Sequence, residues 1–330
     1  MKISVILCTY NRCQSLARAL GSVARSTLPK SVEWEVLVVD NNSTDQTRQV
    51  VDDFSNRFPG RFRYLFVPRP GKSYALNAGI QEAHGEIVVF LDDDVTVDRL
   101  WLGSLTRALE GGVWAGAGGR IVLQWPASIP RWLAIDGAYA RHPFPGFDQG
   151  ENAKELTATP FGTNMAFRRT MFEKYGGFRT DLGPSADPSI PPHSEDTEFG
   201  RRLLTNGERL WYEPSAVVYH PVSQDRINKR YFLSWRFDYG RADARLFEIS
   251  RLRLAGSCIA WALRWILALE PRRRFHHKLI VWENSGRVVE LYRQRQAAKL
   301  KKVQRSGPNR NVMPIESTPP SFERNCKLKS

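Results

Sequence analysis

The stretch from Gly85 to Asp98 constrains the fold of this 330-residue chain more than any other. It contains an unbroken apolar run, Ile87–Leu91, that is rich in β-branched residues. Such a run suits a central strand covered on both faces, as in a parallel sheet. The run ends at three adjacent carboxylates, Asp92–Asp94. Because ligands of open α/β sheets bind at the carboxyl ends of the strands, the sequence predicts a ligand site directly after this strand.

Three neighbouring carboxylates at the end of a buried strand repel one another and are poorly solvated. A divalent cation with an anionic ligand would relieve this repulsion, since hard cations take oxygen ligands and often bridge to phosphates. The alternative is an acidic loop in which an aspartate caps the next helix. Both interpretations stay open on this stretch alone, because short motifs also match by chance.

Strand-like and helix-like segments alternate from the first residue, which is typical of a doubly wound α/β domain. We predict strands over Ile3–Leu7, Glu35–Val39, Arg61–Val67 and up to Asp92, each followed by a helix. Polar residues follow three of these strands: Thr9–Arg12, Asp40 and Asp92–Asp94. They would meet at one edge of the sheet.

The pattern changes after Gly116. Residues 179–193 contain four prolines and predict a mobile loop. Ser194 then predicts a helix cap, because acidic residues follow it in the first turn. A last strand is expected over Leu210–Tyr219, closing at His220.

The formal net charge of +14 is unevenly distributed. Positions 1–223 hold 24 basic and 25 acidic residues, whereas positions 224–330 hold 24 basic and 9 acidic residues. We therefore predict an α/β domain over 1–223, a basic helical extension over 224–305 and a disordered tail over 306–330. The basic extension points to an anionic surface, either membrane or nucleic acid.

The four cysteines show neither metal-ligand nor disulfide-framework spacing, so free thiols in a reducing cytosol are the simplest account. The N-terminal apolar run is too short for a signal peptide, and no stretch reaches the roughly 18 apolar residues of a membrane span. We expect a cytoplasmic protein. Its basic helices either rest peripherally on the inner face of a membrane or only cap the α/β domain, with their basic face solvated.

Six motifs in order resemble the family 2 glycosyltransferases, which are inverting enzymes with the GT-A fold. They are VILCTYNR, VLVVDNNSTD, GKSYALNAGI, VVFLDDD, GTNMAFRR and SEDTEFGRRL. The resemblance covers about residues 1–223. The resemblance implies a Rossmann-like, mostly parallel sheet flanked by helices, with the basic helical extension as an appendage. It also implies transfer of a sugar from a nucleotide-diphosphate sugar to a saccharide or lipid-linked acceptor, in cell-surface polysaccharide or glycolipid synthesis.

The resemblance implies a donor site at the strand ends. The base would be held by Thr9, Asn11, Arg12 and Asp40, the ribose by Asp92 and Asp93, and the pocket would be lined further by Lys72 and Asn77. Asp94 would hold Mn²⁺ or Mg²⁺ on the diphosphate, where the metal assists the leaving group as a Lewis acid. His220 matches a further metal ligand of some members. Its alternative role is a strand-end histidine bonded to a carbonyl, since imidazole is a less typical ligand for hard cations.

Inversion requires a base that takes the proton of the acceptor hydroxyl on the face opposite the leaving group. The resemblance implies Asp196 as this base, with Glu195 beside it, and places Gly162, Thr163 and Asn164 at the acceptor or sugar side. Alternatively, the acids only cap their helix, because a carboxylate in a first turn is favoured by the helix dipole.

Other functions stay open. Processive members carry a Gln/Arg-x-x-Arg-Trp motif, but Leu233–Arg236 lacks that order, which favours single addition. Residues 92–96 fit the signature of haloacid-dehalogenase phosphatases, although three predicted strands precede them. A sugar nucleotidyltransferase would need a glycine-rich loop after the first strand. The basic third is also compatible with a scaffold without activity, bound to membrane or nucleic acid; the sequence contains no nucleic-acid motif, so that partner is not expected.

Overall fold

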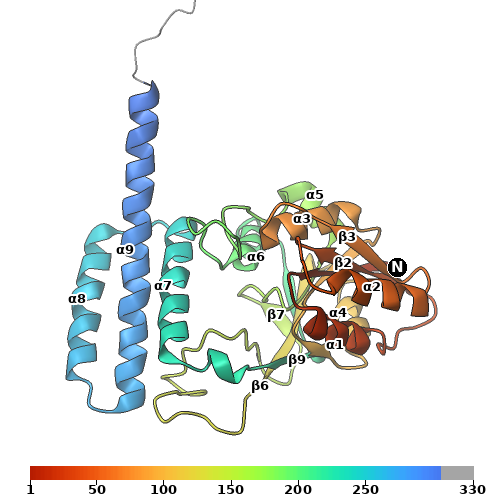
Figure 1. Cartoon of the computed structure of the whole chain (residues 1–330), viewed down its shortest axis with the longest axis horizontal. Helices are drawn as coiled ribbons and strands as arrows, with labels where there is room; N and C mark the ends of the chain where they lie inside the picture. The colour runs from red at the N-terminus through yellow and green to blue at the C-terminus, as the bar shows by residue number, and fades with distance from the viewer. Residues whose placement is uncertain (306–330) are drawn as a thin grey trace, which may run out of the picture. The chain divides into compact units, whose positions relative to one another are not determined.

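The computed structural model describes residues 1–305, with side chains up to Leu300 (Figure 1). Residues Met1–Leu291 form one compact unit, and a second unit begins at Tyr292 within the last helix. The tail predicted to be disordered lies outside the described residues. The domain boundaries predicted at residues 223 and 305 stay predictions.

The first half of the sheet is parallel, as predicted. Its strands are β1 (Lys2–Thr9), β2 (Glu33–Asp40), β3 (Phe62–Phe66) and β4 (Ile87–Asp92), in the order β3-β2-β1-β4. They are connected by α1 (Cys13–Val23), α2 (Thr47–Arg57) and α3 (Lys72–Glu82). This is the Rossmann-like arrangement expected from strands that alternate with helices.

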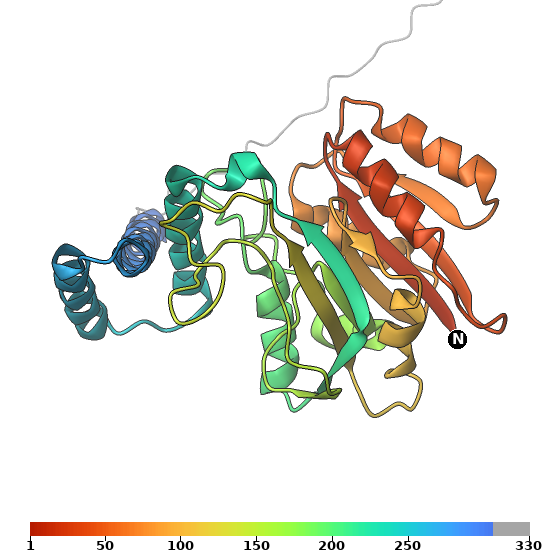
Figure 2. The same ribbon diagram turned by 90° about the horizontal axis from the view of Figure 1, so that it is seen from below.

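The second half of the sheet is mixed (Figure 2). Its strands are β5 (Thr96–Val97), β6 (Gly116–Gln124), β7 (Lys154–Leu156), β8 (Asn164–Arg168) and β9 (Leu210–Pro221). Strand β8 pairs antiparallel with both β4 and β6, while β9 runs parallel to β6. The helices of this half are α4 (Trp101–Arg107), α5 (Arg169–Tyr175) and α6 (Glu195–Thr205). The antiparallel β8 joins the two halves beside the acidic end of β4.

Strand β4 is buried on both faces, as its unbroken apolar run predicted. Val89 and Leu91 pack into the core that includes Leu16 and Leu20 of α1. Val88 and Phe90 belong to the core on the opposite face, which is rich in phenylalanine. Helices on both faces therefore exclude water from β4, and only its carboxyl end, at Asp92, is polar.

The C-terminal part of the described chain is helical, as predicted, with a short 3₁₀ turn, η1 (Gln224–Arg226), before α7 (Lys229–Leu246), α8 (Arg251–Leu267) and α9 (Pro271–Arg305). A third apolar cluster joins Phe232 of α7 and Phe275 of α9 to Leu133 and Phe144 from the long loop after β6. The start of α9 lies between α7 and α8 (Figures 1 and 2). The first turns of α9 are thus part of the same compact unit as the sheet.

Candidate active site

The carboxyl ends of β1, β2 and β4 meet at one edge of the sheet. The register pairs Thr9 with Asp40 and Cys8 with Asp92. A cavity of about 590 Å³ opens at this edge. Its lining from this side includes Thr9, Arg12, Asn41, Asn42, Lys72, Asp92, Asp93, Asp94 and His220. The predicted convergence of polar strand ends is therefore present.

Asp93 is the buried member of the acidic triplet, between the half-buried Asp92 and Asp94. Its carboxylate accepts bonds from Thr9 Oγ1 at 2.7 Å and from Arg12 Nη1 at 3.0 Å. Burial raises the pKa of Asp93 to about 6, with the negative charge of Asp94 adding to the effect and Arg12 opposing it.

Asp94 and His220 form the candidate metal position. His220 Nε2 lies 3.8 Å from Asp94 Oδ1, while His220 Nδ1 lies 3.1 Å from the carbonyl oxygen of Pro221. A carbonyl only accepts, so Nδ1 carries the hydrogen, and in the neutral ring Nε2 then presents a lone pair. With Nδ1 bonded in this way, Nε2 is the ring nitrogen left to share a cation with the Asp94 carboxylate.

The fit to a divalent cation depends on further ligands. Within residues 1–305, no group of three or more His, Cys, Asp or Glu side chains is arranged to hold a metal ion. Mg²⁺ and similar cations are commonly bound by one or two side chains, with substrate phosphates and water completing the shell. Two basic residues also reach Asp94, namely Arg12 at 3.0 Å and Arg226 at 4.0 Å. The donor set therefore fits a metal shared with a phosphate-bearing substrate.

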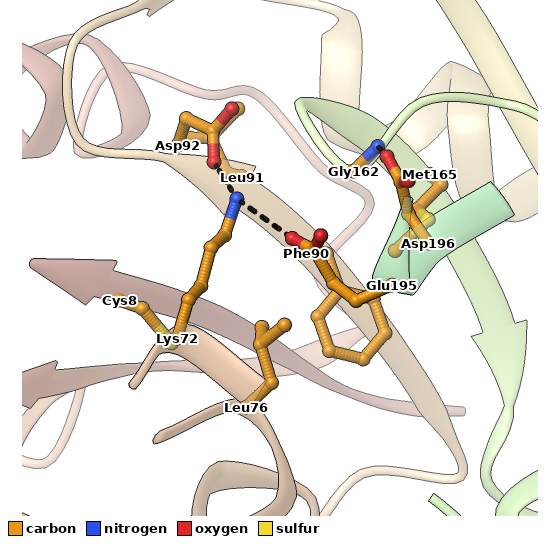
Figure 3. A pocket seen from close by; sticks show the side chains of 10 residues that line it. All are labelled: Cys8, Lys72, Leu76, Phe90, Leu91, Asp92, Gly162, Met165, Glu195 and Asp196. Carbon is orange, nitrogen blue, oxygen red and sulfur yellow. Dashed lines mark hydrogen bonds and ion pairs between the residues drawn. The ribbon is translucent and has the colours of Figure 1, made fainter. Parts of the chain in front are cut away.

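Lys72 links the acidic end of β4 to the start of α6 (Figure 3). Its Nζ lies 2.8 Å from Asp92 Oδ1 and 3.7 Å from Glu195 Oε1. Thr163 Oγ1 donates to the other oxygen of Asp92 at 2.5 Å. Burial opposes charge on Lys72, but the two carboxylates raise its pKa well above the usual value. For Asp92, burial is outweighed by Lys72 and Thr163, which lower its pKa to about 2.

Asp196 faces the same small pocket as Asp92 and Lys72 (Figure 3). Its Oδ2 accepts the backbone N–H of Gly162 at 2.7 Å, and its Oδ1 accepts that of Thr197 at 2.6 Å. Asp92 and Lys72 also line the large cavity. The acidic triplet and the predicted base, Asp196, therefore lie at the same edge of the sheet.

Glu195, beside Asp196, is buried. Burial raises its pKa to about 7, and Asp196 adds to this shift while Lys72 opposes it. The predicted cap at Ser194 is wrong in its chemistry. Ser194 has a left-handed backbone, with φ of 74°, and its side chain makes no capping bond. Instead, the Asp196 carboxylate accepts the Thr197 N–H at this end of the helix.

Four predicted site residues organise the backbone and do not line either pocket. Asp40 accepts bonds from Tyr64 and from Ser43 N–H, and Asn11 accepts the N–H of Thr44. Asn77 bonds the backbone of Phe178 in both directions. Asn164 is fully buried and bonds Trp101 and the carbonyls of Arg120 and Ala216. Their contacts with a ligand stay predictions.

The opposite wall of the large cavity was not predicted. The wall is formed partly by residues 179–193, here called the proline-rich loop. It includes Pro184, Ser185, Ala186, Pro192 and His193 of this loop, with Tyr231 and Trp235. His193 and Trp235 are in ring contact, with centroids 4.6 Å apart. Burial and nearby Arg236 lower the pKa of His193 to about 3, so its ring is neutral at pH 7. No local motif marks these residues, because only the fold brings α7 to the cavity.

The proline-rich loop is hydrogen-bonded at both sides of the cavity. On one side, Lys72 N–H donates to Pro184 O, and Ser73 Oγ donates to Leu182 O, each at 2.8 Å. On the other, Arg241 and Arg245 of α7 both donate to Ser189 O at 2.7 Å. The loop therefore connects the donor side of the site to the helical extension.

Solved structures with the same architecture are known. The mannosyltransferase PcManGT from Pyrobaculum calidifontis, solved with GDP-Man and Mn²⁺, matches with a TM-score of 0.54 at 21% identity, covering 92% of this chain and 79% of that one. GalNAc-T7, solved with UDP, GalNAc and Mn²⁺, matches with a TM-score of 0.55 at 17% identity, covering 76% and 53%. The fold is thus the GT-A fold.

Sequence comparison gives the family. The sequence model described as Glycosyl transferase family 2 matches residues 4–176. The succinoglycan biosynthesis protein ExoM of Rhizobium meliloti is 28% identical over 74% of this chain and 75% of its own length. The glucosyl-dolichyl phosphate glucuronosyltransferase of Haloferax volcanii is 30% identical over 68% and 71%. The chain belongs to glycosyl transferase family 2 and is a glycosyltransferase.

Proposed function

We propose that this enzyme transfers a sugar with inversion from a nucleotide-diphosphate sugar to an acceptor hydroxyl. One observation carries the proposal: Asp92 and Lys72 line both the large cavity and the small pocket that contains Asp196. A donor in the large cavity would thus bring its anomeric carbon towards the carboxylate of Asp196.

The donor would bind along the strand ends. Thr9, Asn11, Arg12 and Asp40 would contact or position the base, Asp92 and Asp93 the ribose, and Lys72 and Asn77 the rest of the donor pocket. Asp94 and His220 would hold Mn²⁺ or Mg²⁺, which would supply charge neutralisation of the departing diphosphate. Arg12 and Arg226 reach the same carboxylate, and they would add positive charge beside the diphosphate.

Asp196 would act as the base. It takes the proton of the acceptor hydroxyl while that oxygen bonds to the anomeric carbon, and the bond from this carbon to the diphosphate oxygen breaks. The Gly162 N–H fixes the Asp196 carboxylate from one side. Glu195, Gly162 and Asn164 would shape the acceptor side, with Asn164 acting from the interior.

The acceptor would be a saccharide or a lipid-linked saccharide. Two relatives are named for succinoglycan synthesis and for transfer to glucosyl-dolichyl phosphate, which supports a role in cell-surface polysaccharide or glycolipid synthesis. We further propose that residues 1–223 are the catalytic domain and that the basic extension, 224–305, holds the enzyme at the inner face of a membrane.

A thermal-shift screen of nucleoside diphosphates, with and without Mn²⁺, tests the donor site. A ligand that binds only the folded state raises its stability by about 2.7 kcal/mol at a concentration 100 times Kd. We expect metal-dependent stabilisation by one or two nucleotides and its loss in Asp94→Ala. Stabilisation that survives Asp94→Ala unchanged would remove Asp94 from the metal site.

The base is tested separately. Asp196→Asn keeps an oxygen that can accept the Gly162 N–H but removes the basicity, so nucleotide stabilisation should persist while transfer falls by about 10²-fold or more. Transfer by Asp196→Asn at near the parent rate would show that another group takes the proton.

A further inference from the structure

Helix α8 has two faces with opposite environments. Leu254, Ser257, Trp261 and Trp265 recur at three- and four-residue spacing and face α9. Ser257 Oγ accepts a bond from Asn284 at 3.0 Å, and the rings of Trp265 and Trp282 lie 6.0 Å apart. This face fixes α8 to the compact unit.

The other face of α8 is apolar and open to solvent. Leu252, Ile259, Leu263, Ile266 and Leu267 are between 55% and 88% exposed. Their successive spacings of seven, four, three and one residues place them on one stripe of the helix. Leu269, which follows the helix, is 94% exposed. Large apolar side chains gathered in this way mark an interaction site, whereas single exposed ones do not.

The charge within α8 has one sign, and Glu248 and Glu270 lie just outside its two ends. Helix α8 contains Arg251, Arg253 and Arg264 and no acidic residue, and all three arginines are exposed. Three more arginines, Arg272–Arg274, begin α9. An apolar stripe bordered by arginines suits a helix that lies in the plane of an anionic bilayer, with the guanidinium groups reaching back to the headgroups.

Trp261 and Trp265 pack against α9 and are not part of the exposed apolar stripe. Interfacial tryptophans commonly anchor proteins at the headgroup level. Here Trp261 packs on His277, with ring centroids 5.3 Å apart, and Trp265 packs on Trp282. They hold α8 on α9, and the leucine and isoleucine stripe is the part left without a protein partner among the described contacts.

We propose that the exposed stripe of α8, flanked by Arg251, Arg253 and Arg264, is a docking surface for an anionic lipid bilayer. The helix lies flat on the membrane and does not cross it: within residues 1–305, no helix combines the length and apolar composition that crossing requires. This deepens the proposed membrane location by assigning it to one face of one helix. The enzyme would then meet a lipid-linked acceptor at the membrane in which that lipid is embedded.

Vesicle flotation of the full chain tests the surface. We expect binding to vesicles of phosphatidylcholine mixed with phosphatidylglycerol and much weaker binding to phosphatidylcholine alone. The variant Leu252→Gln/Ile259→Gln/Leu263→Gln/Ile266→Gln should lose about 100-fold in partitioning, because four apolar side chains no longer enter the bilayer. Replacing Arg251, Arg253 and Arg264 by Gln should cost about fivefold for each arginine.

A matched control removes exposed apolar groups elsewhere. Leu100 and Val113 are 59% and 56% exposed and lie before β6, so Leu100→Gln/Val113→Gln should float like the parent. Equal flotation of the parent and the α8 variant overturns the proposal. So does a parent that ignores vesicles but forms a dimer, by sedimentation, that the α8 variant cannot form, since a second copy would then cover the stripe.

The test does not depend on catalysis. Asp196→Asn should float like the parent, whether or not it transfers sugar. A protein that floats but transfers no sugar contradicts the proposed reaction and leaves the docking surface standing. A protein that transfers sugar but never floats does the reverse.

Discussion

Arg241 Nε on α7 lies 3.2 Å from Glu290 Oε2 on α9, and both side chains are almost fully buried. Arg245 Nε reaches the other oxygen of Glu290 at 2.6 Å. The same two arginines donate to Ser189 O in the proline-rich loop that lines the cavity. Glu290 therefore fixes the arginines that hold one wall of the site.

Glu290→Gln should destabilise the fold strongly. Removing one partner of a buried ion pair typically costs 3–5 kcal/mol, because it leaves charge uncompensated. Here it leaves two guanidinium groups without their shared carboxylate. Urea unfolding should show a midpoint shift of this order. Glu173→Gln, which removes the exposed partner of Arg169, serves as the control and should leave the midpoint nearly unchanged. Equal midpoints for both variants would mean that Glu290 contributes no more than a surface ion pair.

Two glycines set the distance between α7 and α9. A Cβ on Gly240 would lie 1.9 Å from Glu283 O, and one on Gly286 would lie 1.9 Å from Phe237 O. Gly240→Ala must push the helices apart, at a cost of about 1–3 kcal/mol. Gly256 on α8 is the matched control, since a Cβ there meets nothing within 4 Å. Gly256→Ala should stabilise by about 0.5–1 kcal/mol through helix propensity. Thermal melts should move in opposite directions; a Gly240→Ala melt at or above the parent temperature contradicts the close packing.

The α/β half of the fold could be predicted from local patterns. The apolar runs of β1, β2 and β4 show burial on both faces, and the polar residues that end them mark the site. The ordered motifs also predicted the acidic triplet, Lys72 and Asp196 as site residues, and the structure brings them to the same sheet edge. Their distances were not predicted, because the 123-residue separation between Lys72 and Glu195 is closed only by the sheet topology, in which β6 and β8 are added before the chain returns to the same edge.

The second wall of the site could not be predicted from the sequence. Trp235 and His193 carry no motif, and they meet only because α7 packs beside the proline-rich loop. The same holds for Trp261 and Trp265, since tryptophan is common at membrane interfaces but the partners of these two are residues of α9. Contacts between helices far apart in the chain depend on packing angles, which local periodicity does not contain.

Asn41 directly follows Asp40 and lines the large cavity, but it was not predicted as a site residue. Its Oδ1 accepts the Gly71 N–H at 2.7 Å, and its Nδ2 donates to the carbonyls of Val67 and Arg69. Asn41→Asp keeps the shape but replaces the donor by an acceptor, so the buried carbonyl of Val67 and the partly buried carbonyl of Arg69 lose their partner. We expect a loss of about 1–3 kcal/mol in unfolding free energy.

The neighbouring Asn42 provides the control for Asn41. It is exposed and also lines the large cavity. Asn42→Asp should leave the urea midpoint within about 0.5 kcal/mol of the parent, because surface substitutions rarely cost more. Both variants add the same charge near the donor site, so any difference between them reports the hydrogen bonds of Asn41. Equal unfolding free energies would show that those bonds contribute nothing net.

Glu195 should make stability depend on pH with a defined sign. Its carboxyl faces Lys72, Asp196 and Asp92, and burial raises its pKa from 4.5 to about 7. Between these values the folded state binds the proton and the unfolded state releases it. Stability from this group is therefore present below about pH 4.5 and falls as the pH rises to about 7. Glu195→Gln resembles the protonated form and should remove this contribution. Urea midpoints of parent and variant between pH 5 and pH 8 measure it: the variant should gain on the parent as the pH rises. A constant difference across this range would show that Glu195 ionises in the folded protein as it does in the unfolded chain.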